Sequence, residues 1–463
     1  MIYKTLKEIS VYSIGNILVK GLGFASVVLY SNFLTKHQMG VYGYINAVTG
    51  LLASLMLLGI DNAYARYFFE YKSKENRKIL TATTIFFLLL WSNGIAIFFC
   101  FFSKQFSLIL FQNTKYYLVL ILAFISLPIK LILNICNQVL RNQFKAKTVV
   151  ALDFFFSFTV LTLTFIFLKF YNLKIEAIFV SIIISGFLIL PFEFYSIKDL
   201  ITFNIDLTII KKMIIFGAPF FPTSLAYWIF SSADRIMLKN MKGLESVGIY
   251  TVALSLASVV NILSYAISQA WSPNAINIFE TDPHKASVYY GKFLDFLLFL
   301  IFIILFFVSA FGREILLLFF SGYQQSFYPM LILVTGAGFQ ITTQITAIGI
   351  SLKKKTMYFA YLTFFIALLN IGLNYIFIPF LSEKGAALAT TISYGLLTLI
   401  YYLISKKMFK IKYNPKSIIL FICGLLIVYL ISKMDFYIRL IVFLGINFFI
   451  FLNRKKYIRW FVL

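Results

Sequence analysis

The chain has 463 residues, of which 61% are hydrophobic and only 13% are charged, and its mean hydropathy is +0.90. A soluble domain is closer to half apolar and a quarter charged, so this composition excludes a soluble fold. The formal net charge of +24 would suggest nucleic-acid binding in a soluble protein, but here the basic residues must first be assigned to the two sides of a membrane.

Apolar runs of roughly 20 residues, long enough to cross a bilayer, recur from one end of the chain to the other. The first run follows the short basic start MIYKTLKEIS and is too long for the apolar part of a cleavable signal, so it is interpreted as a signal anchor. The sequence predicts an all-α, polytopic membrane protein. About 14 transmembrane helices are expected, near residues 10–33, 40–61, 80–102, 117–140, 149–168, 175–196, 213–237, 246–271, 293–311, 327–351, 357–378, 385–404, 417–432 and 436–453.

The distribution of the 41 Lys and Arg residues predicts the orientation of these spans. With the N-terminus inside, most of them fall in inner segments, including the clusters at 66–78, 353–355 and 406–416. This bias follows the positive-inside rule and places both termini in the cytoplasm. The basic charge is thus a topology signal and an attraction to anionic lipid, and no nucleic-acid partner is expected.

The three cysteines lie in apolar segments and show no metal-ligand spacing, so neither a metal nor another cofactor is predicted. They are Cys100, Cys136 and Cys423.

Parts of the sequence repeat at an offset of 208 to 210 residues, which covers six predicted spans. The pairs are MGVYGYINAV at 39–48 with VGIYTVALSL at 247–256, LTFIFLKFYNLK at 163–174 with LNYIFIPFLSEK at 373–384, and Ala177 and Gly186 with Ala386 and Gly395. Because six is even, both copies cross the membrane in the same direction. The pattern predicts two six-helix lobes, 1–202 and 203–412, followed by two additional transmembrane helices in 413–463. Parallel repeats of this kind are a known transporter plan, with a site between the repeats.

Two lysines are predicted at mid-bilayer depth. Lys20 and Lys130 each lie about ten residues inside a span, at roughly 1.5 Å per residue. An uncompensated charge there costs about 2.5–3.5 kcal/mol on insertion scales and is functional by default. Asn16 and Asn134 lie one helical turn from these lysines on the same faces. We expect these faces to line a water-filled cationic cavity suited to an anionic cargo, although such amides also serve as hydrogen-bonding contacts between helices.

The segment SSADRIMLKN, residues 231–240, places adjacent opposite charges near the outer end of the seventh predicted span. Asp234 and Arg235 should point in different directions, so each needs its own partner or water. They form either a charged outer gate of the cavity or an interfacial pair that extends to water, and depth favours the interfacial pair. No carboxylate is predicted at mid-depth. The acids near the inner ends of spans are expected to be helix caps, and they are Asp61, Asp153, Glu193 and Asp295.

Four stretches together resemble the polysaccharide-biosynthesis flippases, the Wzx-type translocases of O-antigen and capsule repeat units, within the MATE-like (MOP) superfamily. The resemblance covers nearly the full length. The stretches are SIGNILVKGLGFASVVLYSNFLTKHQMGVYGY near the first span, DRIMLKNMKGLESVGIYTVALSLAS at the seventh and eighth spans, QAWSPNAINIF at 269–279, and LLNIGLNYIFIPFLSEKGAALATTISYG at 368–395.

This resemblance implies a MATE-like fold of two six-helix bundles and a bacterial cytoplasmic-membrane location. It implies movement of an oligosaccharide on a polyprenyl diphosphate carrier from the inner to the outer leaflet by alternating access. The family's cationic cavity would correspond here to Lys20, Lys130 and Arg235. The implied partners are the lipid-linked glycan, membrane lipids, and the glycan polymerase and chain-length machinery.

Three other functions compete with this interpretation. A MATE-type exporter would need a buried carboxylate to bind a cation or proton, and none is expected at mid-depth. A peptidoglycan-precursor flippase would carry a cargo of similar charge, and composition does not separate the two. A membrane glycan polymerase would need a large outer loop or an acidic outer motif, whereas the predicted outer loops are short. The two histidines, His37 and His284, fall in loops, so no catalytic residue is predicted.

Overall fold

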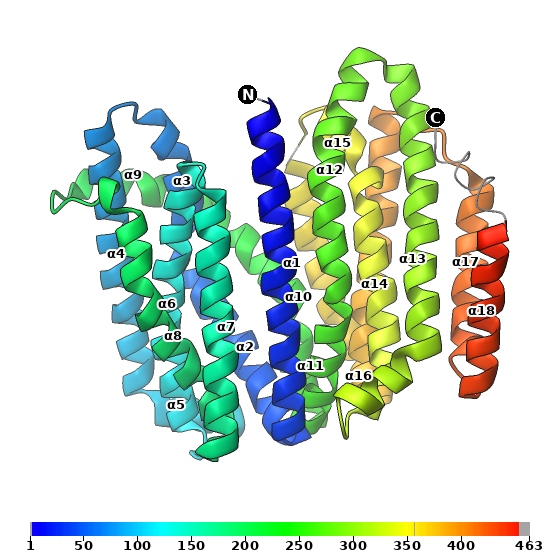
Figure 1. Ribbon diagram of the computed structural model, residues 1–463, viewed down its shortest axis with the longest axis horizontal. Coiled ribbons are helices and arrows are strands. Elements are labelled where there is room, and N and C mark those ends of the chain that lie inside the picture. Colours follow the sequence, from blue (N-terminus) through cyan, green and yellow to red (C-terminus); the bar gives the residue numbers. More distant parts are fainter. Residues whose placement is uncertain (1, 356, 453–463) are drawn as a thin grey trace. The chain divides into compact units, whose positions relative to one another are not determined.

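The computed structural model describes the backbone of residues 2–355 and 357–452. It also describes their side chains, except at 2–14, 265–266, 269–270, 272–273 and 446–452. Within the described ranges every regular element is a helix, which confirms the all-α prediction. Figure 1 shows the helices coloured along the chain from the N-terminus to the C-terminus. Contacts divide the chain into two compact units, Met1–Ile236 and Met237–Leu463.

The helices of the two units follow in sequence order. Unit 1 contains α1 (Ile2–Phe33), α2 (Lys36–Leu57), α3 (Ile60–Glu70), α4 (Lys74–Phe101), α5 (Ser103–Phe111), α6 (Tyr117–Asn142), α7 (Ala146–Phe170), α8 (Ile175–Ser196), α9 (Leu207–Gly217) and most of α10 (Phe221–Lys242). Unit 2 contains α11 (Leu244–Ala257), α12 (Val259–Thr281), α13 (Pro283–Phe319), α14 (Phe327–Thr346), α15 (Ile348–Leu352), α16 (Met357–Met408), α17 (Pro415–Ile431) and α18 (Phe436–Leu452).

Ten helical stretches among the described residues are long and apolar enough to cross a membrane, and two shorter apolar helices lie near the C-terminus. The 52-residue α16 is interrupted at Ser382, whose backbone (φ 52°, ψ −129°) is not helical, so it joins two of the predicted spans. The protein is a multi-pass membrane protein. The exact number of 14 crossings stays a prediction, and residue 453 of the last expected span lies outside the described residues.

Helix starts follow from local sequence. Before α2, the Thr35 side chain accepts a hydrogen bond from the Gln38 backbone N–H, and the Gln38 side chain accepts one from the Thr35 N–H, which is a complete capping box. Asp206 caps α9 in the same way by accepting bonds from Thr208. The bond from the Thr208 hydroxyl is the main reason that the pKa of Asp206 lies below its ordinary value.

The internal repeat is visible in the backbone of both units. Asn172 and Ser382, which occupy equivalent places in the repeated segments, both have a φ of 52°, a value that is uncommon outside glycine. Helix packing repeats as well. Gly186 in α8 lies against Ile129 of α6, and Gly395 in α16 lies against the ring of Phe339 in α14, at matching offsets. Backbone and packing thus match at these paired positions, and the division into two six-helix lobes stays a prediction.

The division between the compact units lies within α10, after residue 236. In unit 1, α9 packs against α3 and α4, and the Trp228 indole N–H of α10 donates to the Ala47 carbonyl of α2 at 2.7 Å. These contacts explain why most of the seventh predicted span clusters with unit 1. The lobe boundary expected at residue 202 rests on the repeat rather than on contacts, and it stays a prediction.

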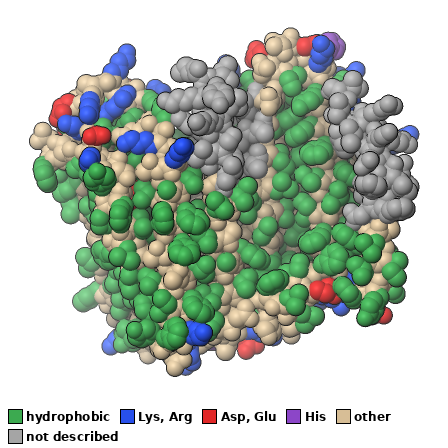
Figure 2. Space-filling model, in the orientation of Figure 1, with side chains coloured by type: hydrophobic (Ala, Val, Ile, Leu, Met, Phe, Trp, Pro, Cys, Tyr) green, Lys and Arg blue, Asp and Glu red, His purple; other side chains and the backbone are tan. Residues whose placement is uncertain are grey.

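The helix flanks are covered with apolar side chains. Figure 2 shows hydrophobic residues over the sides of the helices, and Lys and Arg at their ends. Aromatic residues such as Phe98 and Phe380 (84% exposed) would be unfavourable in water but are suited to lipid. Inside unit 1, a buried cluster from α3, α4, α6, α7, α8 and α9 forms the core, with Tyr64, Leu88 and Val139 among its members.

The two C-terminal helices both pack against α13. The Ser309 hydroxyl of α13 donates to the Val428 carbonyl of α17 at 2.7 Å. The Arg439 guanidinium of α18 forms a bidentate pair with Glu314 of α13, at 2.7 and 3.2 Å, and also donates to the Ala310 carbonyl at 2.7 Å. The Arg439 side chain is only 4% exposed, so this pair is a buried attachment point for α18.

Candidate functional site

A polar pocket lies inside unit 1 where α6, α7 and α8 meet. It has a volume of about 210 Å³, and Lys130, Asn134, Asn137 and Arg141 of α6 line one side at successive helical turns. This confirms that Lys130 and Asn134 share a face, as their spacing predicts, and Asn137 and Arg141 continue the same face. Polar side chains in a spanning helix require hydrogen-bonding partners inside the protein, because lipid tails offer none.

Two carboxylates line the opposite side of this pocket, Asp153 from α7 and Glu193 from α8. Asn137 Nδ2 donates to Asp153 Oδ1 at 2.8 Å. Glu193 is 1% exposed, and its Oε2 has no hydrogen-bond partner among the described protein atoms. The expectation that these two acids are interfacial caps is wrong, because neither lies at a helix N-terminus and both face the pocket of Lys130. With all groups ionised, the two acids balance Lys130 and Arg141.

Lys20 and Asn16 lie elsewhere in unit 1, on α1. Lys20 is exposed, Asn16 is half-buried, and α1 packs mainly against α7. Among the described residues that line the α6–α8 pocket, none comes from α1. The structure therefore does not bring Lys20 into the pocket of Lys130. A single vestibule that contains both lysines stays a prediction.

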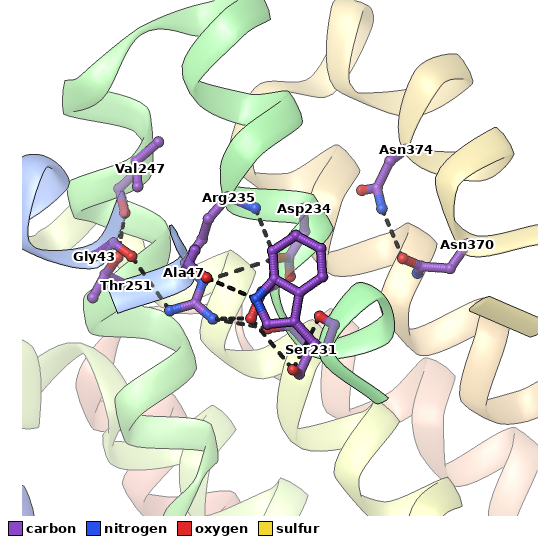
Figure 3. Close-up of polar contacts among 11 residues, drawn as sticks. Gly43, Ala47, Ser231, Asp234, Arg235, Val247, Thr251, Asn370 and Asn374 are labelled. Carbon is purple, nitrogen blue, oxygen red and sulfur yellow. Dashed lines mark hydrogen bonds and ion pairs between the residues drawn. The ribbon is translucent and has the colours of Figure 1, made fainter. Parts of the chain in front are cut away.

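Asp234 and Arg235 lie together in the last turns of α10, beside α2 (Figure 3). Their side chains are only 3% and 13% exposed. The expectation that they extend to water is therefore wrong, because the protein encloses both side chains.

The two side chains also contact each other, although adjacent residues on a helix were expected to point in different directions. Arg235 Nε lies 3.9 Å from Asp234 Oδ1, and the same oxygen accepts the Arg235 backbone N–H at 2.7 Å. The guanidinium donates to the Ser231 carbonyl and the Ser232 hydroxyl, both at 2.9 Å, and to the Gly43 carbonyl of α2 at 3.5 Å. The long side chain folds back along its own helix, which sequence spacing alone does not show. The bond to Gly43 is the link from this pair to α2.

Unit 2 carries neutral polar groups in comparable helices. The Asn374 amide donates to the Asn370 side-chain carbonyl at 2.9 Å, and the Asn370 amide donates to the Ser393 hydroxyl at 3.2 Å (Figure 3). These amides act as contacts between the two halves of α16. At the offset that pairs Ile129 with Phe339, Gln340 is the counterpart of Lys130, so unit 2 has a neutral amide at the position of this lysine.

The described residues contain no cluster of three or more His, Cys, Asp or Glu that could hold a metal ion. The site thus consists of a half-buried lysine among amides and carboxylates, within helices that cross a membrane. Such intramembrane charges mark the pathways of substrates and ions in transport proteins.

The fold is that of a multi-pass membrane protein with a polar pocket inside unit 1. A family model for "Polysaccharide biosynthesis protein" matches residues 5–279, and the chain belongs to this family. No curated protein matches the chain.

Solved structures of the MOP superfamily share the fold. One is "Lipid II flippase MurJ, inward closed conformation", with a TM-score of 0.76 and 17% identity over 96% of this chain and 99% of that one. Another is an inward-facing multidrug resistance MATE family transporter, with a TM-score of 0.70 and 15% identity over 83% of this chain and 93% of that one. The predicted MATE-like fold is confirmed.

Proposed function

We propose that this protein is a flippase that moves a polyprenyl-diphosphate-linked oligosaccharide repeat unit from the inner to the outer leaflet of a bacterial cytoplasmic membrane. The observation that carries the proposal is the half-buried Lys130, held in a polar pocket of spanning helices in a chain of the polysaccharide-biosynthesis family. A diphosphate brings negative charge that is stabilised by ammonium and guanidinium donors once water is removed.

Each of the predicted residues has a role in this proposal. Lys20 and Lys130, with Asn16 and Asn134 beside them, donate hydrogen bonds to the diphosphate as the two units alternate between inner and outer access. Arg235 links α10 to the Gly43 carbonyl of α2 and pairs with Asp234, and these two residues form the proposed outer gate. The chain has no catalytic role. Polymerase and chain-length machinery are the proposed partners for the delivered glycan.

The size of the α6–α8 pocket limits what it can bind. At about 210 Å³ it is smaller than the 300–1,000 Å³ typical of sites that enclose a whole small-molecule ligand. It therefore suits part of a headgroup rather than a sugar unit. The glycan itself would travel outside this pocket.

The proposed topology has both termini in the cytoplasm. The basic clusters at 66–78, 353–355 and 406–416 support it, because cytoplasmic loops retain Lys and Arg. In this orientation the α10–α11 and α13–α14 connections and the break in α16 face outward.

A cation exporter is the second candidate, and one observation favours it. The sequence argument against an exporter was the absence of a mid-depth carboxylate, but Glu193 is 1% exposed and lines the pocket with Asp153. A buried carboxylate of this kind suits a proton or a cation. The fold is also shared with MATE family transporters and with a lipid II flippase, so cargo must be decided by experiment.

Reconstituted protein separates these candidates. We expect proteoliposomes that contain the purified chain to expose a polyprenyl-diphosphate-linked oligosaccharide to an external glycosidase at least 10-fold faster than protein-free vesicles. A peptidoglycan precursor and a cationic dye should move no faster than in the control vesicles. Faster movement of the dye with no movement of the glycan lipid would establish the exporter instead.

A further inference from the structure

Unit 2 contains a second and larger cavity, which the proposed pathway does not use. Its volume is about 850 Å³, and it lies among the ends of α10, α11, α13 and α14 and the break in α16. This volume is within the range of sites that enclose a small-molecule ligand. None of the predicted site residues lines it. Under the proposed topology it opens on the outer side of the membrane.

Two aromatic side chains, Phe327 and Tyr328, contact positive charges of this cavity. Arg313 Nη2 donates to the Tyr328 hydroxyl at 3.0 Å, and the Arg313 guanidinium lies 5.0 Å from the centre of the Phe327 ring. The Lys384 ammonium lies 5.0 Å from the centre of the Tyr328 ring. Cation–π contacts of this kind orient a cation without neutralising it. Both charges therefore stay available to an anion.

Two acidic and two amide side chains also line the cavity. Glu245 and Glu383 face the same cavity, as do the exposed Gln324 and Gln325. Within the described residues, no ion pair joins these carboxylates to the cations of the cavity. With Lys242, Arg313 and Lys384 the formal charge is three minus two, or +1. Carboxylates and amides are suited to hydroxyl groups, and the Tyr328 ring offers a flat apolar surface.

The backbone of this cavity is strained at one point. Ser382 has φ 52° and ψ −129°, a conformation that costs a residue with a side chain about 1–3 kcal/mol. The break places Ser382, Glu383 and Lys384 together on the cavity wall. Strain of this kind persists where the surrounding structure compensates for it, and it concentrates at binding sites.

We propose that this cavity binds an acidic saccharide, a sugar that carries a carboxylate or a phosphate. Arg313 and Lys384 contact the anionic group, Tyr328 packs against the apolar face of the ring, and Gln324 and Gln325 bond its hydroxyls. The choice of a saccharide rests on the proposed function, because that function delivers a glycan to this side of the membrane. The site would hold the sugar part of the cargo after it crosses.

Soluble sugars test the site without any transport step. The full chain in phosphatidylcholine nanodiscs is titrated with glucuronic acid, glucose, glucose 1-phosphate and inorganic phosphate, with binding followed by saturation-transfer NMR. We expect glucuronic acid and glucose 1-phosphate to bind at least 10-fold more tightly than glucose. Arg313→Gln and Lys384→Gln should each weaken this binding about 10-fold, and Tyr328→Phe should weaken it less.

Lys433→Gln is the matched control, because the Lys433 ammonium lies over the Tyr429 ring at 4.5 Å, outside the cavity. It should leave saccharide binding unchanged. Equal affinity for glucose and glucuronic acid, equal loss in the control, or phosphate binding as tight as glucose 1-phosphate would overturn the inference. If phosphatidylglycerol in the nanodisc displaces the sugars, the site belongs to a lipid headgroup instead. Absent saccharide binding with intact glycan-lipid translocation would reject this site and leave the proposed function standing.

Discussion

Removal of both mid-depth lysines, in a Lys20→Ala/Lys130→Ala double variant, is expected to lower surface glycan at least 100-fold while the protein stays in the membrane. A hydrogen bond to a charged group contributes about 1.5–3 kcal/mol, so two lost contacts with the diphosphate exceed a factor of 100. The measurement compares surface glycan with the amount of membrane-inserted protein in the same cells.

A control of equal charge change is available in the same unit. Lys104 and Lys169 are exposed, and their ammonium groups lie over the rings of Tyr117 and Phe165 at the ends of helices. The double variant Lys104→Ala/Lys169→Ala should retain normal glycan display. Lys130→Met keeps the volume of the side chain but removes one of the two contacts, so it should lower surface glycan at least about 10-fold. Normal display by the Lys20/Lys130 double variant would refute the role of both lysines.

Loss of the buried Arg439–Glu314 pair is expected to produce the largest change in stability. Arg439→Ala leaves Glu314 without its bidentate partner and removes the guanidinium donor from the Ser309 and Ala310 carbonyls of α13. Removal of one partner of a buried pair typically costs about 3–5 kcal/mol. We expect a clear fall in the thermal unfolding midpoint in detergent, together with easier proteolysis before α18.

The exposed pair Arg66–Glu70 provides the comparison, since its atoms are 3.9 Å apart and both side chains are more than half exposed. Arg66→Ala should change the midpoint little, because exposed pairs contribute about 0–1 kcal/mol. The double variant Arg439→Met/Glu314→Leu should recover most of the loss, because it removes both charges together. A wild-type midpoint for Arg439→Ala would show that α18 is held by its apolar contacts alone.

Much of the fold was predictable because lipid limits the possible structures. Apolar length identifies helices, and the repeat at 208–210 residues pairs positions whose backbone matches, such as Asn172 and Ser382 with the same φ. The polar face of α6 was predictable for the same reason, because Lys130, Asn134, Asn137 and Arg141 recur at helical spacing. One helix face is a local property of the sequence.

Contacts between helices were harder to predict from the sequence. Asp153 and Glu193 are single acids on α7 and α8, and neither belongs to a periodic polar face, so depth along the chain was a poor guide to their surroundings. The available signal was the presence of acids several residues inside apolar runs. The burial of Arg235 depends on α2, which is almost 200 residues away in sequence, and no local pattern reports that packing.

The most direct measurement for the proposed pathway is photo-crosslinking of a polyprenyl-diphosphate-linked oligosaccharide to the intact chain. A photoreactive amino acid replaces Asn16 or Asn134, beside the two lysines, and Phe98 or Phe380 on the apolar flanks serves as the control position. We predict labelling at 16 and 134 that inorganic diphosphate reduces, with unaffected labelling at the controls. Labelling confined to the control positions would contradict the pathway through Lys20 and Lys130.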